Sequence, residues 1–369
     1  MDRREFLRLG GVACAAAASP LVIPRSVAAE GAPRHPARHW EAIDGGRVRC
    51  MLCPRMCTLA SRERGYCGVR KAEDGHLYTL VHSRPCSVRN DPIEKKPLFH
   101  YHPGTDSFSL ATAGCNLGCL FCQNWRISQF RPEEVESIHL PPDQVVSQAL
   151  SAGSRSIACT YSEPIAFYEY TYDIAAESRR RGIGTVMISN GFINRRPMEQ
   201  LLDVLDAVKI DLKAFRDTFY RELCDAELRP VLDTLRLIRS RGVWLEIVVL
   251  LVPTRNDDEG EIRAMARWIL QELGPDVPLH FTRFHPTYRL TNLPSTPVRT
   301  LERSRQIALD VGLHYVYAGN VPGHPGEDTF CHGCGHHLIS RDGFVIRFNR
   351  IRDGRCPACS VQIPGRWSR

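Results

Sequence analysis

Residues 114–125 read GCNLGCLFCQNW and place Cys115, Cys119 and Cys122 in a C-x3-C-x2-C pattern. Three thiolates this close together can bind three irons of a cubane 4Fe–4S cluster, which four cysteines normally hold. The pattern therefore predicts a cluster whose fourth iron is open to another ligand. A structural zinc knuckle and a conventional ferredoxin loop are the alternatives, but zinc sites favour C-x2-C pairs and a ferredoxin needs a fourth cysteine ligand.

The chain on both sides of this stretch alternates between strand and helix patterns. Strands are expected at residues 107–113, 156–160, 184–190, 207–212, 243–252, 279–284 and 313–317. Helices are expected at residues 142–152, 165–181, 196–205, 227–241, 258–273 and 298–311. Strands that alternate with helices indicate βαβ units and an α/β fold with a parallel sheet. Because the cysteine stretch directly follows the first strand, polar residues at the carboxyl ends of later strands should gather beside it.

Polar side chains follow the second, third and fourth expected strands. The segments are TYSEP at residues 160–164, SNGF at 189–192 and KIDLK at 209–213. Since successive side chains of a strand point to opposite faces, we expect Lys209, Asp211 and Lys213 to share one face and to point inward. A structural salt bridge among these three residues is the alternative.

A second group of cysteines lies nearer the start of the chain. Its pattern is C-x2-C-x3-C-x9-C, formed by Cys50, Cys53, Cys57 and Cys67. Four thiolates suit either Zn²⁺ or a closed 4Fe–4S cluster, and the softness of the ligands does not separate the two. The sequence therefore predicts a metal site here and leaves zinc or a second cluster open.

A third group ends the chain with two C-x2-C pairs about twenty residues apart, made of Cys331, Cys334, Cys356 and Cys359. Paired knuckles of this kind predict a zinc ribbon, and the strand pattern at residues 343–349 supplies its hairpin. Rubredoxin-type iron would use the same ligands. Such a ribbon usually binds a partner or caps a domain.

The composition supports metal binding over other uses of cysteine. The chain has 369 residues and 15 cysteines, of which eleven fall in the three groups above. That length is too great for a disulfide scaffold. The net charge of +7 is spread without a basic run, which favours a solvated surface over nucleic-acid binding.

Taken in order, these motifs resemble the AmmeMemoRadiSam-system radical SAM proteins, which are similar to pyruvate formate-lyase activating enzymes. The resemblance covers nearly everything after residue 38 and includes the stretch DPIEKKP at residues 91–97. It implies a partial (β/α)6 barrel in which the amino and carboxylate groups of S-adenosylmethionine (SAM) occupy the open iron. It also implies reductive cleavage of SAM to a 5′-deoxyadenosyl radical, which abstracts hydrogen from a protein or a small molecule. A low-potential donor of the flavodoxin or ferredoxin type would supply the electron.

The resemblance also assigns roles to individual residues. TYSEP is similar to the GGEP-type motif but lacks both glycines, and Glu163 would bind the SAM ammonium. SNGF is similar to the TNG-type motif, so Ser189 and Asn190 would meet the ribose or carboxylate. KIDLK is similar to the DLK segment, so Asp211 and Lys213 would meet SAM or substrate.

Two further positions follow from the same comparison of motifs. The loop VPTRND at residues 252–257 is similar to the family's VIPG-x-ND loop, with Thr254 where glycine is usual, which puts the tight turn in doubt. His285 closes the sixth strand and is expected to face the pocket as a hydrogen-bonding group.

The first residues read as an export signal. Residues 2–8, DRREFLR, resemble the twin-arginine motif, and residues 9–23 form an apolar region too short, and interrupted by Pro20, to span a membrane stably. Export would make the protein periplasmic or membrane-associated. SAM and low-potential reductants are cytoplasmic, so the cytoplasm is the alternative.

We therefore expect a signal segment at 1–29, a four-cysteine module with its linker at 30–105, a radical SAM barrel at 106–322 and a zinc-ribbon-like module at 323–369. A glycyl-radical-enzyme activase in the strict sense is one alternative, although QNW at residues 123–125 departs from the usual HNP-like segment. A non-catalytic iron–sulfur electron carrier or metal-handling protein is the other, but an electron carrier has no need of a SAM pocket.

Overall fold

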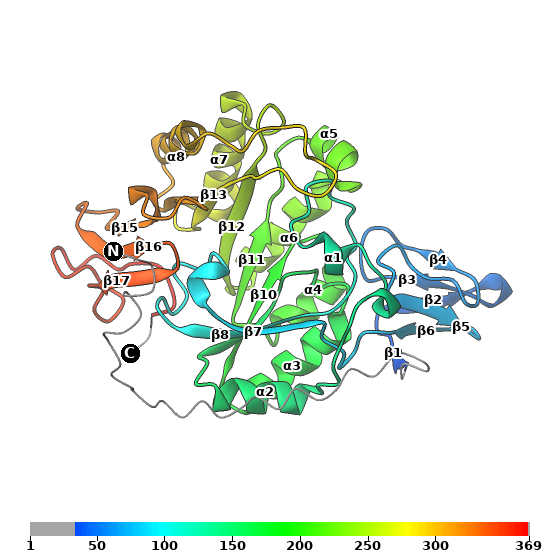
Figure 1. Ribbon diagram of the computed structural model, residues 1–369. Helices are drawn as coiled ribbons and strands as arrows, with labels where there is room; N and C mark the ends of the chain where they lie inside the picture. The colour runs from blue at the N-terminus through cyan, green and yellow to red at the C-terminus, as the bar shows by residue number, and fades with distance from the viewer. Residues whose placement is uncertain (1–33, 368–369) are drawn as a thin grey trace, which may run out of the picture.

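The computed structural model describes residues 34–367, so the expected signal segment lies outside the described residues. Its centre is a sheet of eight strands in the order β14-β13-β12-β11-β10-β9-β8-β7 (Figure 1). The strands are β7 (Ser87–Pro92), β8 (Asp106–Ala111), β9 (Ser156–Cys159), β10 (Gly184–Ser189), β11 (Ala207–Asp211), β12 (Trp244–Leu251), β13 (Leu279–Arg283) and β14 (Val316–Gly319). Neighbours from β8 to β14 run parallel, and β7 runs antiparallel to β8. Since β7 and β14 are opposite edges, the fold is an α/β partial barrel, as expected.

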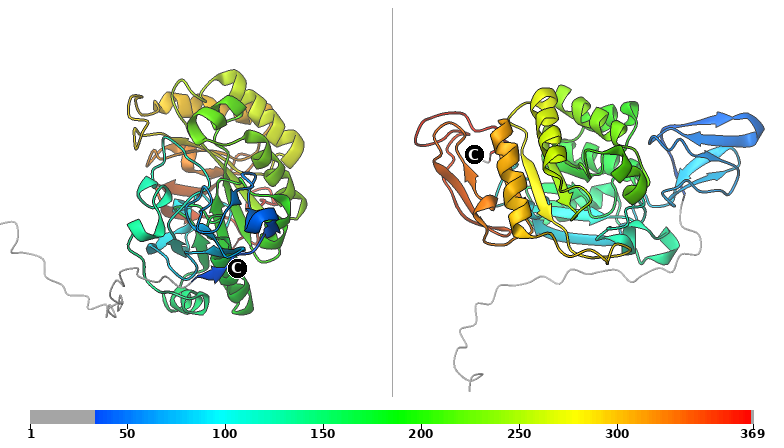
Figure 2. Two further views of the ribbon diagram at one scale, coloured as in Figure 1. Left: turned by 90° about the vertical axis from the view of Figure 1, so that its right-hand side faces the viewer. Right: turned by 90° about the horizontal axis from the view of Figure 1, so that it is seen from above.

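Helices cover the outer face of this curved sheet (Figures 1 and 2). They are α2 (Pro142–Ser151), α3 (Tyr168–Arg180), α4 (Arg195–Leu202), α6 (Leu228–Ser240), α7 (Glu259–Leu273) and α8 (Val298–Val311). Their ends follow local chemistry: the Asp258 side chain accepts a hydrogen bond from Glu261 N at 2.9 Å to cap α7, and Gly312 ends α8 with a φ of 112°. The expected elements therefore form within a few residues of their predicted bounds.

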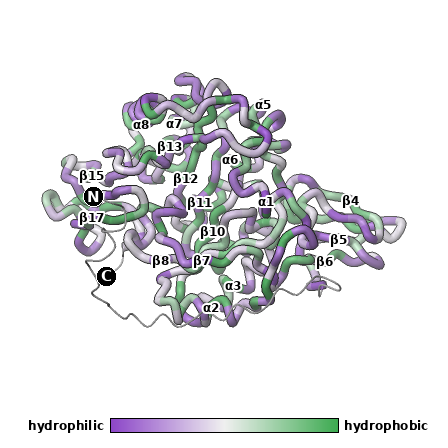
Figure 3. Tube along the Cα trace, in the orientation of Figure 1, coloured by the Kyte–Doolittle hydropathy of each residue, from purple (hydrophilic) through white to green (hydrophobic). Residues whose placement is uncertain are grey.

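The core is built from near-continuous apolar strands. β12 reads WLEIVVLL, a pattern typical of a parallel strand that is buried on both faces. Figure 3 shows hydrophobic positions along such inner strands. The exception is Glu246, whose fully buried carboxylate accepts hydrogen bonds from the backbone N–H groups of Phe99 and His100 at 3.0 and 2.8 Å.

The cysteine-rich module before the barrel consists of two three-stranded sheets. One joins β1 (His35–Pro36), β6 (His76–Thr79) and β5 (Arg70–Glu73), and the other β2 (Trp40–Ile43), β3 (Arg47–Cys50) and β4 (Thr58–Leu59). It projects from one side of the barrel, on the right in Figure 1. The predicted linker thus includes a short strand, β1, which pairs with β6.

The last module lies on the opposite side of the barrel (Figures 1 and 2). Its sheet contains β15 (Thr329–Phe330), β16 (His337–Asp342) and β17 (Val345–Asn349). The buried Arg341 side chain ties it to the rest of the chain by donating to the Phe99 carbonyl at 3.0 Å, while a bond to Thr329 Oγ1 at 2.7 Å fixes the same side chain within the module. Within residues 34–367, no helix combines the length and the apolar character needed to cross a membrane.

Candidate active site

The cysteine loop after β8 opens onto a cavity of about 420 Å³ inside the barrel. Cys115, Cys119 and Cys122 line this cavity. Two backbone bonds hold the loop: Gly118 N donates to Cys224 O at 3.0 Å, and Leu120 N donates to Leu223 O at 2.9 Å. Their acceptors belong to a short π-helix (Tyr220–Cys224), an irregularity common at functional sites.

All the other residues predicted to contact SAM line the same cavity. They are Glu163, Ser189, Asn190, Asp211 and Lys213. Each follows or ends one of three neighbouring parallel strands, β9, β10 and β11, whose carboxyl ends meet at one edge of the sheet. The structure thus brings together eight residues that are spread over about a hundred positions of the sequence.

Glu163 is buried, with 2% of its surface exposed, and is held by three donors. Its Oε1 accepts from Ser189 Oγ at 2.6 Å and from Ile165 N at 3.1 Å, and its Oε2 accepts from Asn190 N at 2.8 Å. Burial raises the pKa of this carboxyl to about 7 although these hydrogen bonds lower it. Because only one bond is made to Oε2, that atom keeps room for a further donor from the cavity.

Asn190 links this carboxylate to the cysteine loop. Its Nδ2 donates to Asn116 Oδ1 at 2.8 Å and lies 3.8 Å from Cys115 Sγ, while its Oδ1 accepts from Phe192 N at 2.8 Å. The polar atoms of the Asn190 side chain are therefore occupied by the protein. This residue positions Glu163 and Cys115 more directly than it could bind a ligand.

Three charged residues, Lys209, Asp211 and Lys213, lie at the end of β11, the strand next to β10. Asp211 bonds to Lys209, and its Oδ2 accepts from Lys213 Nζ at 3.0 Å. Burial acts to raise the pKa of Asp211, but the two ammonium groups outweigh it and hold the pKa at about 2. Lys209 and Lys213 share the single carboxylate of Asp211, so these three residues keep an excess positive charge beside the cysteines.

A second charged group, which was not predicted from the sequence, places Lys95 and Lys96 in the cavity wall. Lys96 Nζ donates to Asp91 Oδ2 at 2.6 Å and to Tyr161 OH at 3.2 Å, and Lys95 Nζ donates to Asp91 Oδ1 at 3.0 Å. Burial lowers the pKa of Lys96 to about 8. The DPIEKKP stretch carries these residues, but only the folded chain shows that they face the cavity.

Two residues stand where glycines are usual and keep the left-handed backbone that glycine favours. Tyr161, in TYSEP, has a φ of 62°, and Thr254, in VPTRND, has a φ of 66°. Thr254 N is held by Asp257 Oδ1 at 2.7 Å. The tight turn that Thr254 put in doubt therefore forms.

His285 does not face the cavity. Its side chain is exposed, and its Nδ1 lies 3.0 Å from Ser295 Oγ. The strand ends two residues earlier, at Arg283, so His285 belongs to the following loop.

The three loop cysteines fit a polynuclear cluster. Among the described residues, only two groups of three or more potential ligands have their atoms within 4.8 Å of one another, and the loop cysteines are in neither. At least two of their sulfurs are therefore more than 4.8 Å apart, a spacing that suits thiolates bound to different irons better than thiolates bound to one ion. Burial raises the pKa of Cys115 and Cys122, whereas a hydrogen bond with Cys224 lowers that of Cys119.

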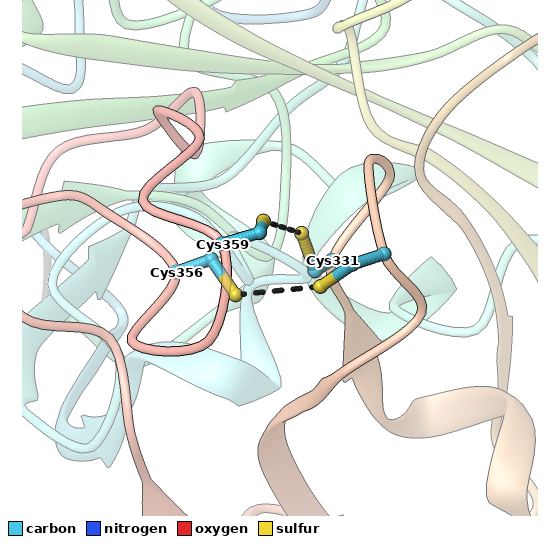
Figure 4. Close-up of side chains that lie close together, drawn as sticks. Cys331, Cys356 and Cys359 are labelled. Carbon is cyan, nitrogen blue, oxygen red and sulfur yellow. Dashed lines mark hydrogen bonds between the residues drawn. The ribbon is translucent and has the colours of Figure 1, made fainter.

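The C-terminal cysteines form a compact group. The Sγ atoms of Cys331 and Cys359 are 3.6 Å apart, those of Cys334 and Cys356 are 3.7 Å apart, and all four lie within 4.8 Å of one another. Figure 4 shows Cys331, Cys356 and Cys359 with their sulfurs turned toward one another. The ribbon-like module therefore has the donor set of a tetrahedral zinc or iron site.

The second compact group is formed by His35, His82 and Asp173. Its two imidazole rings are stacked at 3.8 Å, and His82 Nε2 lies 2.9 Å from Asp173 Oδ2. Asp173 is also paired with Arg38 at 2.9 Å. The N-terminal cysteines Cys50, Cys53, Cys57 and Cys67 belong to neither compact group, although they line one small cavity of their own.

Comparison with known proteins identifies the class. The family model of the radical SAM superfamily matches residues 109–269. An uncharacterized protein of Methanocaldococcus jannaschii is 44% identical over 330 residues, which cover 89% of this chain and 98% of that protein. Pyruvate formate-lyase 1-activating enzyme of Escherichia coli is 23% identical over 217 residues, 54% of this chain and 87% of that enzyme.

Two further matches cover less of the sequence or are more distant. Isethionate sulfite-lyase activating enzyme of Oleidesulfovibrio alaskensis is 31% identical over 134 residues, 36% of this chain and 43% of that enzyme. The solved structure of a radical SAM methyltransferase from Sphaerobacter thermophilus has 16% identity and a TM-score of 0.48, and the match covers 62% of this chain and 71% of that one.

The chain belongs to the radical SAM superfamily, and it is a radical SAM enzyme similar to pyruvate formate-lyase activating enzymes. Membership implies SAM and a 4Fe–4S cluster as cofactors.

Proposed function

We propose that the protein cleaves SAM reductively at a 4Fe–4S cluster held by Cys115, Cys119 and Cys122, and that the resulting 5′-deoxyadenosyl radical abstracts hydrogen from a protein or a small molecule. The observation that carries the proposal is the shared cavity. The three cysteines and the five polar residues expected to bind SAM line a single space. An electron carrier has no need of such a pocket, which favours the enzyme over a non-catalytic metal protein.

The residues that line the cavity have different roles in binding SAM. When bound, the cluster supplies the electron that breaks the C5′–S bond. Glu163 accepts a hydrogen bond from the amino group of SAM, and Ser189 and Asn190 fix that carboxylate in place through their own bonds to it. Lys209 and Lys213, at the end of β11, add positive charge to the cavity wall, which attracts the carboxylate of SAM or an anionic substrate.

Two observations bear on the substrate. The relatives from Escherichia coli and Oleidesulfovibrio alaskensis are named as activating enzymes of other enzymes, which favours a protein substrate and keeps the strict glycyl-radical-enzyme activase as the second candidate. Phe344, at the tip of the ribbon hairpin, lines the cavity while 48% of its surface is exposed. An exposed aromatic side chain at the cavity suits contact with a partner protein.

The remaining assignments belong to the same proposal. Zinc fills the C-terminal cysteine site, and a donor of the flavodoxin or ferredoxin type delivers the electron. The four divisions at 1–29, 30–105, 106–322 and 323–369 remain predictions. Twin-arginine export also remains one, because its segment lies outside the described residues.

The test is reconstitution of the protein under anaerobic conditions with iron and sulfide, followed by dithionite, SAM and chromatography for 5′-deoxyadenosine. We expect the wild type to form it and Cys115→Ala, Cys119→Ala and Cys122→Ala variants to form none while they stay folded. Cys86→Ala, which removes a partly buried thiol outside all three groups, is the matched control and should behave as the wild type. Normal 5′-deoxyadenosine formation by the triple alanine variant would refute the assignment.

A further inference from the structure

The N-terminal cysteines surround one small cavity beside the radical SAM loop. Cys50, Cys53, Cys57 and Cys67 all line it. The backbone turns around them, since Cys50 N donates to Cys57 O at 2.9 Å and Tyr66 N lies 3.5 Å from Cys57 Sγ. Four thiolates in one enclosed space are a complete ligand set for a metal centre.

The distances between the sulfurs help to distinguish zinc from an iron–sulfur cluster, the two possibilities that the sequence leaves open. A tetrahedral zinc site with Zn–S bonds of about 2.3 Å requires sulfurs about 3.8 Å apart. The C-terminal cysteines meet this requirement, with contacts of 3.6 and 3.7 Å. The N-terminal four do not, because no three of their sulfurs lie within 4.8 Å of one another. They share this wider spacing with the loop cysteines, and it suits thiolates that each bind a different iron.

Arg70 supports an anionic centre in this cavity. Its side chain lines the cavity with 1% exposure and pairs with Glu169 at 3.1 Å. Its Nε has no hydrogen-bond partner among residues 34–367. A buried N–H group usually has a hydrogen-bond acceptor. The sulfurs of an iron–sulfur cluster accept such bonds, and these bonds help to set the reduction potential of the cluster.

The cavity shares a wall with the active site. Asn116 lines the N-terminal cavity, and its neighbour Cys115 lines the catalytic one. Arg55 Nε donates to Asn116 O at 2.7 Å. At Gly114, where φ is 95°, an added Cβ would lie only 2.6 Å from Cys67 O, so glycine is needed for this close approach.

We propose that Cys50, Cys53, Cys57 and Cys67 bind a second 4Fe–4S cluster, which passes single electrons to the SAM-cleaving site. The transfer of electrons between the two sites, called the relay below, rests on the proposed function, whereas the presence of the second cluster does not. A ferredoxin- or flavodoxin-type donor loses one electron to the N-terminal cluster, which returns to its oxidised state by giving that electron to the catalytic centre. One electron then leaves with each SAM cleaved, so the balance closes without a further reactant.

The cluster is tested in a Cys115/Cys119/Cys122→Ala triple variant, which keeps the N-terminal site intact. After anaerobic purification we expect about four irons and about four acid-labile sulfides per chain, the content of one cluster. Adding Cys53→Ala and Cys67→Ala should remove the sulfide, whereas adding Cys86→Ala should not. Neither zinc nor rubredoxin-type iron brings sulfide. A triple variant with zinc at both four-cysteine sites and no sulfide would therefore overturn the proposal. This outcome decides the question even if the variant that also carries Cys53→Ala and Cys67→Ala fails to fold.

The relay is tested in the otherwise intact chain carrying Cys53→Ala and Cys67→Ala. We expect 5′-deoxyadenosine formation to persist with dithionite and to be lost with reduced flavodoxin as the donor. Equal rates with both reductants, or loss with both, would overturn the relay. Failure of the wild type to cleave SAM would instead refute the proposed function, and the sulfide content would still decide the cluster.

Discussion

Among single residues, Glu163 has the contacts that best suit binding of SAM. Its carboxylate collects donors from β10 and from the loop after β9, so it connects two strand ends before any ligand arrives. A site prepared in this way loses little freedom when SAM binds.

Glu163→Ala should therefore weaken SAM binding and leave the iron content unchanged. Loss of a hydrogen bond to a charged group costs on the order of 1.5–3 kcal/mol. At about 1.4 kcal/mol per decade this is a weakening of roughly 10- to 150-fold. Titration of the reconstituted variant with SAM measures it, with Glu259→Ala, an exposed carboxylate paired to Arg303, as the control. An unchanged dissociation constant would make Glu163 a structural carboxylate at the start of the following turn.

The same residue predicts a pH dependence. Because burial raises the pKa of Glu163 to about 7, the free enzyme protonates this carboxyl as the pH falls through that value. Protonation removes the charged acceptor, so SAM affinity should decrease below pH 7 by as much as about tenfold per unit and level off above it. Isothermal titration calorimetry with SAM between pH 6 and 8 measures this dependence. In Glu163→Gln, the part of the pH dependence of SAM affinity that is due to Glu163 should disappear. A slope equal in both proteins would assign the titration to another group.

Some residue-level features could not be predicted from the sequence. Tyr161 and Thr254 replace expected glycines, and nothing local shows that they keep a left-handed φ. Tyr161 is held by Asp91 and Lys96, about seventy residues away in the chain. Contacts between positions so distant arise only from the complete fold.

Among the elements, the alternation of strands and helices was predictable because buried apolar residues recur with a strand or a helix period along each βαβ unit. Helix α8 has the expected bounds, and the strand pattern at 207–212 gives β11. The edge strand β7 was not predicted, since SVRNDP is polar and, within the described part of the chain, pairs with β8 alone. The short strands of the N-terminal module were missed for a similar reason: turns and thiolates, not apolar periodicity, shape that module.

The C-terminal ribbon should hold its own metal ion. We expect one zinc per chain at Cys331, Cys334, Cys356 and Cys359, because their sulfurs already have tetrahedral spacing. Metal analysis of Cys359→Ser should show this zinc lost, while the iron and sulfide bound elsewhere remain. The control is Ser360→Ala, next to the ligand. Stoichiometric iron without zinc in the wild type would make the site rubredoxin-like.

At the scale of the molecule, one buried side chain joins the last module to the barrel. Arg341 has 4% of its surface exposed, donates to Phe99 O, Glu327 O and Thr329 Oγ1, and stacks on the Phe99 ring at 4.1 Å. Arg341 thus bonds both to its own module and to Phe99, which lies 242 positions earlier in the sequence.

Arg341→Ala should lower the free energy of unfolding by on the order of 3 kcal/mol, since three buried acceptors lose their donor. Thermal denaturation of the metal-loaded protein measures the change. Arg347→Ala is the control, because its side chain is 61% exposed and pairs only with Asp342 in the same sheet. Equal melting temperatures for the two variants would show that the modules are stable independently of this contact.

The contact between the early and late parts of the chain also has a consequence for synthesis. His100 Nδ1 meets Pro364 O at 2.6 Å, and the two residues are 264 positions apart. A ribosome adds about 5–20 residues per second, so roughly 13–53 s pass between the making of one partner and the other. During that interval His100 and Phe99 remain open to solvent and to other chains. The surface around Phe99 and His100, which the last module covers in the folded protein, is therefore a place where the nascent chain can make wrong contacts before synthesis ends.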